Sequence, residues 1–265
     1  MLDMASFREM TDSLCKDLVY MLIYFQGEPY LNPNFLAMAS YAAQRGIYVG
    51  TSTNGHYLTD SIAKATVESG LHEVIVSIDG ATQSTYQQYR IGGSLEKVKE
   101  GTRRLVEWRQ RLQSRTPHII LQFLVTGANE QEVDEVKALG GELGVDRVVF
   151  KTAQIYDFEN GHPLIPQDER FSRYKKGREG KYILKNKLRN QCWKLWMGAE
   201  MTWDGRILPC CFDKDAQYEM GKLSEASFRS IWRGAGYVDF RSRLVRSRQS
   251  IAMCTNCSEG GQIWA

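Results

Sequence analysis

Short apolar runs alternate with longer amphipathic stretches through the first 155 residues of the chain. The apolar runs have the length and the branched or aromatic composition of buried strands, and they cover residues 18–25, 46–50, 72–78, 119–125 and 146–150. A helical spacing of apolar residues precedes each run, at residues 5–17, 33–45, 59–69, 95–113 and 130–143. Strands that alternate with helices form a parallel sheet that the helices cover. The pattern therefore predicts an α/β fold with five parallel strands, fewer than the eight of a closed barrel.

This rhythm stops after residue 155. Residues 156–190 are polar and irregular, with a run rich in lysine and arginine, and they predict a linker. Residues 191–265 hold five of the six cysteines and predict a small separate domain. At 265 residues the chain is long enough to bury one large core and one small core. We therefore expect three parts, at residues 1–155, 156–190 and 191–265.

Four cysteines of the last part have the spacing of metal ligands. Cys254 and Cys257 form a C-x-x-C pair, which places two sulfurs side by side. Cys192 and Cys210 flank the turn at residues 203–206, which lies between two short apolar runs and predicts a hairpin. Four thiolates suit either an iron–sulfur cluster or a structural zinc ion, and the spacing leaves both open.

The other cysteines and the N-terminal residues bear on the cellular compartment. Cys211 directly follows Cys210 and is the alternative ligand at that position, whereas Cys15 lies in a helical pattern and is expected to be an inert buried thiol. Nothing near residue 1 resembles a secretory signal, and the longest apolar run, residues 18–25, is too short to cross a bilayer. We therefore expect a cytoplasmic protein with reduced thiols and no membrane association. A net charge of +3 is too small to argue for a nucleic-acid partner.

Polar residues and glycines follow the first three predicted strands. Residues 26–29 read Gln-Gly-Glu-Pro, residues 51–55 read Thr-Ser-Thr-Asn-Gly, and residues 77–80 read Ser-Ile-Asp-Gly. Ligands of parallel α/β folds bind at the carboxyl ends of the strands. Gly27 lets a ligand approach the backbone, and Pro29 leaves carbonyls to accept from an ammonium group. Serine, asparagine and aspartate hold sugar hydroxyls, so the three turns together predict a polar cofactor pocket.

In this order, the motifs resemble those of a radical S-adenosylmethionine (SAM) enzyme. The matching motifs of the first part are Gly27-Glu28-Pro29, residues 53–55, residues 77–80, and Tyr89-Arg90 with Gly-Gly-Ser at 92–94. The last part resembles the SPASM/twitch auxiliary-cluster domain in Cys192-x-x-x-Trp196, residues 203–205, Pro209-Cys210-Cys211 and Cys254-x-x-Cys257. Such enzymes have a partial (β/α)6 barrel whose strand ends hold SAM. A small domain with one or two further clusters follows the barrel.

The resemblance implies a role for each matching residue of the first part. Backbone carbonyls around Gly27, Glu28 and Pro29 would receive the methionyl ammonium of SAM. Arg90 would bind the SAM carboxylate, because its planar fork suits bidentate binding. The residues implied to face the ribose or the substrate are Ser77, Asp79, Asn54 and, in the fourth strand, Gln122. Asp79 is also a candidate proton acceptor for catalysis.

For the tail, the resemblance favours a [4Fe–4S] cluster over zinc. It implies the single-cluster version of the domain, with Cys192, Cys210, Cys254 and Cys257 as the four ligands. A cluster with four cysteine ligands has no open iron site, which suits electron transfer or a structural role. The tryptophans of the tail are expected to form its core and to shield the cluster from water: Trp193, Trp196, Trp203 and Trp232.

One motif of the family is missing from the sequence. Family members carry C-x3-C-x2-C in the loop after the first barrel strand, where the cluster that cleaves SAM is bound, and the only cysteine in this region is Cys15. We therefore expect the first strand and the cysteine loop to be absent, which leaves an unpaired sheet edge. Two hypotheses follow from this departure. The chain is either a truncated piece of a full enzyme or a natural degenerate member that serves as an iron–sulfur or zinc binding module.

If the full protein is an enzyme, the resemblance implies a radical SAM oxidoreductase or maturase. Such an enzyme would generate a 5′-deoxyadenosyl radical to modify a peptide or, as the second choice, a sugar-like small molecule. An electron donor such as a flavodoxin or a ferredoxin would supply the reducing equivalent. The sequence does not distinguish these substrates.

Overall fold

The computed structural model describes residues 1–260, and the chain folds into two compact units. We call the first the sheet unit; it consists of Cys15–Ala153 and Gly161–Ser172. We call the second the cysteine unit; it consists of Met1–Leu14, Gln154–Asn160 and the chain from Arg173 onward. The stretch that the sequence predicts to be a linker thus contributes residues to both units.

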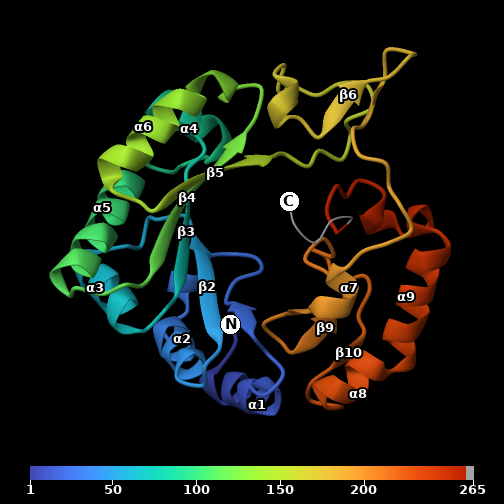
Figure 1. The fold of residues 1–265 in the computed structure, drawn as a ribbon, viewed down its shortest axis with the longest axis horizontal. Coiled ribbons are helices and arrows are strands. Elements are labelled where there is room, and N and C mark those ends of the chain that lie inside the picture. The colour runs from blue at the N-terminus through green and yellow to red at the C-terminus, as the bar shows by residue number, and fades with distance from the viewer. Residues whose placement is uncertain (261–265) are drawn as a thin grey trace. The chain divides into compact units, whose positions relative to one another are not determined.

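The sheet unit contains five parallel strands in the order β1-β2-β3-β4-β5 (Figure 1). The strands are β1 (Tyr20–Leu22), β2 (Tyr48–Thr53), β3 (Glu73–Ser77), β4 (His118–Val125) and β5 (Arg147–Thr152). The helices are α2 (Phe35–Ala43), α3 (Asp60–Glu68), α4 (Gln83–Tyr89), α5 (Leu95–Arg111) and α6 (Val133–Leu143), with 3-10 turns η1 (Pro29–Leu31), η2 (Glu130–Glu132) and η3 (Glu169–Phe171). Helices α2, α3, α5 and α6 lie along one side of the sheet (Figure 1). This arrangement confirms the predicted α/β fold with a parallel five-stranded sheet.

Alternation along the strands decides which side chains face the helices. Val74 and Val76 of β3 are fully buried, and so are Leu121 and Phe123 of β4. Successive side chains of a strand point to opposite faces, so the residues between these four point away from the helical layer. The face of the sheet away from the helices carries polar side chains near the carboxyl ends of the strands.

Edge strand β1 is shorter and more exposed than the sequence predicts. Residues 18–25 are expected as a buried strand, but only Tyr20–Leu22 pairs with the neighbouring strand β2. Tyr20 is 45% exposed and Leu22 is 39% exposed, because β1 lies at the edge of the sheet and has a partner on one side only. Apolar composition alone does not distinguish an edge strand from a central one.

The hydrophobic pattern also misses helix α4. Its sequence is Gln-Ser-Thr-Tyr-Gln-Gln-Tyr, and its one buried residue is Tyr86, so it has no apolar periodicity. A reciprocal capping box between Thr82 and Thr85 begins the helix. The carboxylate of Glu132 adds to the cap, because it accepts from the backbone N–H of Ala81 at 2.7 Å and from the Thr85 hydroxyl at 2.7 Å. Local polar contacts therefore form this helix.

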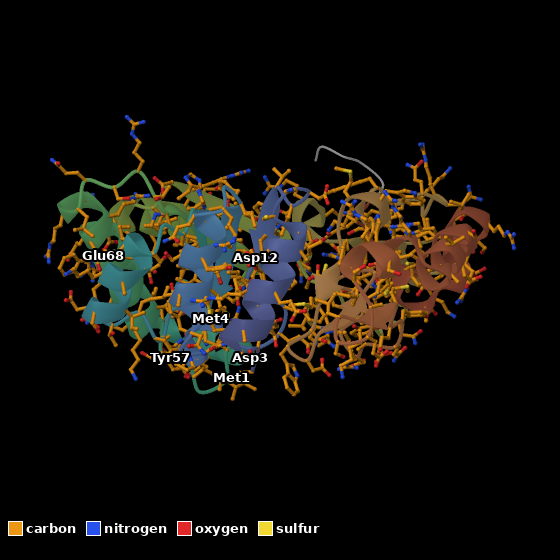
Figure 2. All side chains as sticks on the ribbon, turned by 90° about the horizontal axis from the view of Figure 1, so that it is seen from below. Met1, Asp3, Met4, Asp12, Tyr57 and Glu68 are labelled. Atoms are coloured by element: carbon orange, nitrogen blue, oxygen red, sulfur yellow. The ribbon has the colours of Figure 1, made fainter. Side chains whose placement is uncertain are left out.

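The cysteine unit begins with helix α1 (Met4–Leu14), which the Asp3 carboxylate caps by accepting from the N–H groups of Ala5 and Ser6 (Figure 2). Two small antiparallel sheets follow. The first pairs β6 (Tyr174–Lys176) with β7 (Tyr182–Leu184), and the second has the order β10-β9-β8 with β8 (Glu200–Met201), β9 (Arg206–Leu208) and β10 (Gly221–Lys222). The β8–β9 pair is the hairpin predicted around residues 203–206. The β6–β7 pair lies in the stretch predicted to be irregular.

Helices complete the cysteine unit. They are α7 (Lys194–Met197), α8 (Phe228–Arg233) and α9 (Ala235–Arg246), with 3-10 turns η4 (Arg248–Ser250) and η5 (Ala252–Cys254). Leu195, Phe240, Leu244 and Ile251 pack together with Cys192 and Cys254 in one apolar cluster. The cysteines are therefore part of a core and do not lie on a surface loop.

The prediction that the tryptophans of the tail form its core is wrong for two of the four. Trp196 is 47% exposed and Trp203 is 65% exposed. Trp203 lies in the tight turn between β8 and β9, where a side chain points outward, and aliphatic residues with Phe240 fill the core instead. Trp232 packs at a second cluster around Ile207, Ile231 and Tyr237.

Within residues 1–260, no helix combines the length and the apolar character that crossing a membrane requires.

Candidate functional site

The turn after β1 is fastened to the end of β2 by one carboxylate. Glu28 accepts from the Thr53 hydroxyl at 2.8 Å through Oε1 and from the backbone N–H of Asn54 at 2.8 Å through Oε2. Its Oε1 also accepts from the N–H of Tyr30 at 3.3 Å, which caps η1. Gly27 has a positive φ of 88°, a conformation that favours glycine. The sequence-predicted residues Gly27, Glu28 and Asn54 are thus brought together, with Glu28 as a clamp.

Asp79 and Arg90 form a second pair of predicted residues. The Arg90 Nε donates to Asp79 Oδ2 at 2.5 Å, and the backbone N–H of Leu124 donates to Asp79 Oδ1 at 2.9 Å. The side-chain amide of Asn129 donates to the Asp79 carbonyl at 3.0 Å. Asp79 is only 2% exposed, and both of its carboxylate oxygens accept hydrogen bonds from the protein itself. Arg90 keeps about a third of its side chain exposed.

Ser77 and Gln122 are the third pair. They are opposite each other in the register of β3 and β4, and both alternate with residues that face the helices. Both side chains therefore point to the face of the sheet away from the helical layer. Cross-strand partners lie about 5 Å apart at Cβ, so these two side chains line the same part of that face.

His56 connects two of the polar turns, and sequence analysis assigns it no role. Its Nε2 accepts from the backbone N–H of Ser94 at 2.9 Å, and its Nδ1 lies 3.1 Å from the carbonyl oxygen of Asn54. An accepting Nε2 requires the proton to be on Nδ1, which then donates to that carbonyl. His56 thus ties the loop after β2 to the Gly-Gly-Ser turn at residues 92–94. A histidine next to Asn-Gly gives no sequence signal for this.

Four cysteines of the cysteine unit line one small cavity. The cysteines are those predicted as ligands: Cys192, Cys210, Cys254 and Cys257. The rest of the wall consists of Lys194, Arg248 and Glu259 with apolar Leu195, Phe212, Leu244 and Met253. Sulfurs around one zinc ion lie about 2.3 Å from the metal. Four cysteines around one cavity supply the thiolate ligands that an iron–sulfur cluster or a zinc ion takes.

Within residues 1–260, no group of three or more His, Cys, Asp or Glu side chains is placed to hold a metal ion. Cys211, the alternative ligand, does not line the cavity within the described part of the chain. The position and the acidity of the two thiols favour different ligands: Cys210 lines the cavity, whereas Cys211 is the more acidic thiol. A hydrogen bond from Cys210, aided by the ammonium of Lys194, lowers the pKa of Cys211 to about 7, whereas the pKa of Cys210 is raised. Position carries more weight, because a metal deprotonates any thiol that it binds.

Burial raises the pKa of two other thiols of the cavity. It raises the pKa of Cys254 to about 11, against the opposing effect of the Arg248 guanidinium, and it also raises the pKa of Cys257. Buried thiols are neutral near pH 7 and release protons when they bind a metal. Nearby, burial and the Cys211 thiolate raise the pKa of Glu200 to about 7. The surroundings of Cys254 and Cys257 thus favour thiols until a metal is bound.

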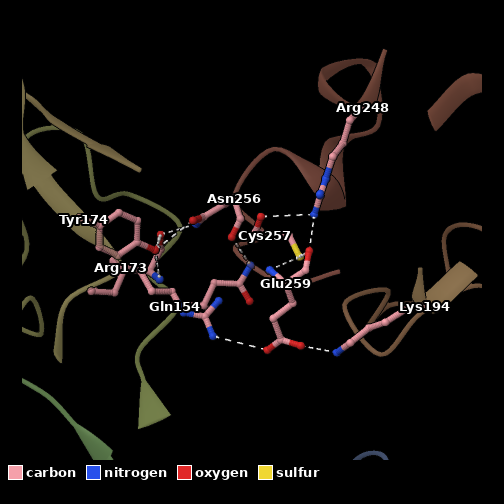
Figure 3. Close-up of polar contacts among 9 residues, drawn as sticks. Gln154, Arg173, Tyr174, Lys194, Arg248, Asn256, Cys257 and Glu259 are labelled. Carbon is pink, nitrogen blue, oxygen red and sulfur yellow. Dashed lines mark hydrogen bonds and ion pairs between the residues drawn. The ribbon is translucent and has the colours of Figure 1, made fainter. Parts of the chain in front are cut away.

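The backbone after Cys257 closes the cavity through a polar network (Figure 3). The carboxylate of Glu259 pairs with Lys194 and lies 3.8 Å from Arg173. Its backbone N–H lies 3.4 Å from the Cys257 sulfur, a donor placed as in cluster sites. Asn256 is held by Gln154, whose amide donates to its carbonyl at 3.1 Å, and by the Tyr174 hydroxyl at 3.0 Å. The C-x-x-C turn is thus fixed on both sides.

Fold and site define a class: a parallel α/β sheet with polar strand ends, followed by a small unit with a four-cysteine cavity. The chain belongs to the radical SAM superfamily, which matches residues 2–140, and its residues 192–258 match the SPASM iron-sulfur cluster-binding domain. These two domains imply [4Fe–4S] clusters and S-adenosylmethionine as cofactors. The matched SPASM region includes all four cysteines of the cavity.

Three curated relatives are similar over most of the chain. The tungsten-containing aldehyde ferredoxin oxidoreductase cofactor-modifying protein of Pyrococcus furiosus is 27% identical, over 89% of this chain and 73% of its own length. The mycofactocin maturase of Mycobacterium tuberculosis is 23% identical, over 94% of this chain and 68% of its own length. A mycofactocin maturase of Mycolicibacterium smegmatis is similar at 22% identity, over 94% of this chain and 68% of its own length.

Solved structures share the fold. SuiB of Streptococcus suis bound to S-adenosylmethionine gives a TM-score of 0.68 at 13% identity, over 97% of this chain and 65% of that one. The protein anSMEcpe with bound AdoMet gives a TM-score of 0.66 at 14% identity, over 97% of this chain and 76% of that one. At these identities the likeness concerns the fold alone.

Proposed function

We propose that this chain is the core of a radical SAM maturase that binds SAM at the carboxyl ends of its parallel strands, holds one auxiliary [4Fe–4S] cluster in its tail, and modifies a peptide. The observation that carries the proposal is the cavity lined by Cys192, Cys210, Cys254 and Cys257. It supports a resident cluster because four thiol groups and the buried Arg248 line one cavity, within a region that matches the SPASM iron-sulfur cluster-binding domain.

The strand ends supply the binding groups for SAM. When bound at a reduced [4Fe–4S] cluster, SAM would take up one electron and supply, with release of methionine, a 5′-deoxyadenosyl radical that takes a hydrogen atom from the substrate. The carbonyls of residues 27–29 accept from the methionyl ammonium, and the Glu28 clamp holds that turn in place. Ser77 and Gln122 hold hydroxyl groups from the open face of the sheet, with Asn54 at the neighbouring strand end.

Arg90 has a divided role in this proposal. Its Nε is bound to Asp79, which orients the guanidinium and leaves the opposite side of the planar fork for a carboxylate. Asp79 therefore acts by positioning Arg90, and the proposal assigns it no proton transfer. The exposed third of Arg90 is consistent with a side chain that reaches a ligand.

Four cysteine ligands leave no open iron site, so the auxiliary cluster transfers electrons or stabilises the tail and does not bind substrate. A flavodoxin or ferredoxin is the proposed electron donor. The peptide substrate is proposed because the relatives include mycofactocin maturases, and because a structural neighbour, SuiB, is known in a complex with its precursor peptide SuiA at a TM-score of 0.65.

Equilibrium dialysis of labelled SAM against the anaerobically reconstituted chain tests the proposal. We expect saturable binding, weakened about tenfold by Gln122→Leu, since one lost hydrogen bond to a ligand corresponds to about 1.4 kcal/mol. Gln110→Leu, at an exposed position of α5, is the matched control and leaves the binding unchanged. A chain that contains its cluster but binds no SAM would support the alternative of a non-catalytic iron–sulfur module.

A further inference from the structure

Arg248 is a charged side chain that is almost completely buried. It is 3% exposed and lies at the start of η4, six residues before Cys254. Arg248 is one of the residues that line the cysteine cavity. A buried guanidinium is costly unless hydrogen bonds and a counter-charge compensate it. The surroundings of Arg248 therefore show what it is placed to bind.

The hydrogen bonds of Arg248 connect the segments that carry the cysteines. Its Nη1 donates to the carbonyl of Gln191 at 3.1 Å, next to Cys192. Its Nη2 donates to the carbonyls of Cys257 at 3.3 Å and Glu259 at 2.8 Å (Figure 3). One side chain thus joins the backbone before the first ligand to the backbone around the last. Three of the four predicted ligands are positioned by these bonds and by the peptide chain between Arg248 and Cys254.

The Nε of Arg248 takes no part in these hydrogen bonds. It is fully buried and has no hydrogen-bond partner within residues 1–260. The ion pairs found in this part of the chain include none with Arg248, and the nearby Glu259 carboxylate pairs with Lys194 and Arg173 instead. Within residues 1–260 its Nη donors bond to neutral carbonyls, the guanidinium also interacts with the Cys254 thiol, and no carboxylate forms an ion pair with it.

A cluster held by four thiolates would supply both missing partners. It carries a net negative charge, and its sulfurs accept hydrogen bonds. We propose that Arg248 is the positioning residue of the auxiliary cluster, which fastens the ligand segments and raises the reduction potential of the cluster by directing its Nε–H and its charge into the cavity. Adding an electron makes the cluster more negative, so a fixed cation at its edge stabilises the reduced form. This inference rests on the proposed cluster in the tail.

The test is an anaerobic redox titration, monitored by electron paramagnetic resonance, of the reconstituted chain with Arg248→Gln and Arg248→Lys. At the midpoint potential of the unmodified chain, the ratio of reduced to oxidised cluster should fall about tenfold in Arg248→Gln, a shift of about 59 mV for one electron. Arg248→Lys keeps the charge and loses the fork, so we expect a smaller shift together with lower iron content. Arg246→Gln, an exposed arginine two residues earlier, is the matched control with unchanged potential.

Iron and sulfide analysis separates the possible failures. If the unmodified chain holds no iron–sulfur cluster, the proposed function fails and this inference fails with it. If it holds the cluster, and either variant retains iron while titrating at the potential of the unmodified chain, the inference about Arg248 is wrong and the proposed function stands. If Arg248→Gln loses the cluster, the potential of Arg248→Lys decides: a negative shift supports the inference, and an unchanged potential overturns it.

Discussion

Gly260 lies directly against the sulfur of Cys192. A Cβ atom built on Gly260 would come within 3.0 Å of Cys192 Sγ, closer than Cβ atoms approach their neighbours in proteins. The carbonyl of Gly260 also accepts from the backbone N–H of Trp193 at 3.1 Å. The end of the C-x-x-C segment therefore folds back on the first predicted ligand, and the space for a side chain at Gly260 is occupied by that thiol.

Gly260→Ala should therefore displace Cys192 and lower the cluster content of the reconstituted chain at least several-fold. Gly260 has a positive φ of 78°, so alanine also introduces backbone strain of about 1 kcal/mol. Gly180→Ala is the matched control, since its φ is 76° and an added Cβ has no neighbour within 4 Å. Iron and sulfide are measured in both variants. Equal cluster content in the two would show that Cys192 does not need this space.

The buried ion pair of Asp79 and Arg90 predicts an effect on stability. Arg90→Met leaves a carboxylate that is 2% exposed without its cation, which should lower the free energy of unfolding by about 1–3 kcal/mol. The estimate is below the cost of breaking a fully buried pair because Arg90 is partly exposed. Arg103→Met, at an exposed position of α5, should change it by less than about 0.5 kcal/mol. Urea denaturation of both variants gives the comparison, and equal midpoints would contradict it.

The choice between Cys210 and Cys211 can be tested by substitution. Cys210→Ala and Cys254→Ala should each abolish most of the bound iron, because each removes a thiol of the cavity. Cys211→Ala and Cys15→Ala should retain it. Iron per chain, measured after identical reconstitution, decides the assignment. A chain that loses iron with Cys211→Ala and keeps it with Cys210→Ala would reverse the ligand assignment at this position.

Thiol reactivity in the metal-free chain should depend on pH in a residue-specific way. The pKa of Cys211 is lowered to about 7 and that of Cys254 is raised to about 11. The reactive thiolate exists above the pKa, so alkylation of Cys211 should rise through pH 7 while Cys254 stays slow up to pH 9 or higher. Cys210→Ala removes the main cause of the low value and should move the Cys211 midpoint upward. Mass-spectrometric mapping of iodoacetamide labelling follows each site; a Cys211 midpoint at 9 or above would contradict the prediction.

The sequence predicts the part of this structure that depends on repeating pattern. Apolar runs place five strands and most helices, because burial imposes a periodicity that is visible in composition. The C-x-x-C pair and the hairpin predict which cysteines line a common cavity. Parallel strands also bring Ser77 and Gln122 together, since both lie near the carboxyl ends of neighbouring strands.

The sequence fails to predict contacts that depend on one side chain reaching a distant backbone. Nothing around Glu28 indicates that its carboxylate, and not only its backbone, serves the turn. Arg248 matches no motif of the sequence, yet it is buried at the cysteine cavity. Trp203 is expected in the core of the tail from the resemblance to the auxiliary-cluster domain but is exposed in a tight turn. Tertiary context decides each of these cases.

The most direct measurement is the iron, acid-labile sulfide and zinc content of the anaerobically reconstituted chain, read with the electron paramagnetic resonance spectrum of the reduced sample. The account predicts about four irons and four sulfides per chain, the content of one [4Fe–4S] cluster, and a signal that disappears in Cys254→Ala. About one zinc with no sulfide would contradict it and would make the four-cysteine cavity a structural zinc site.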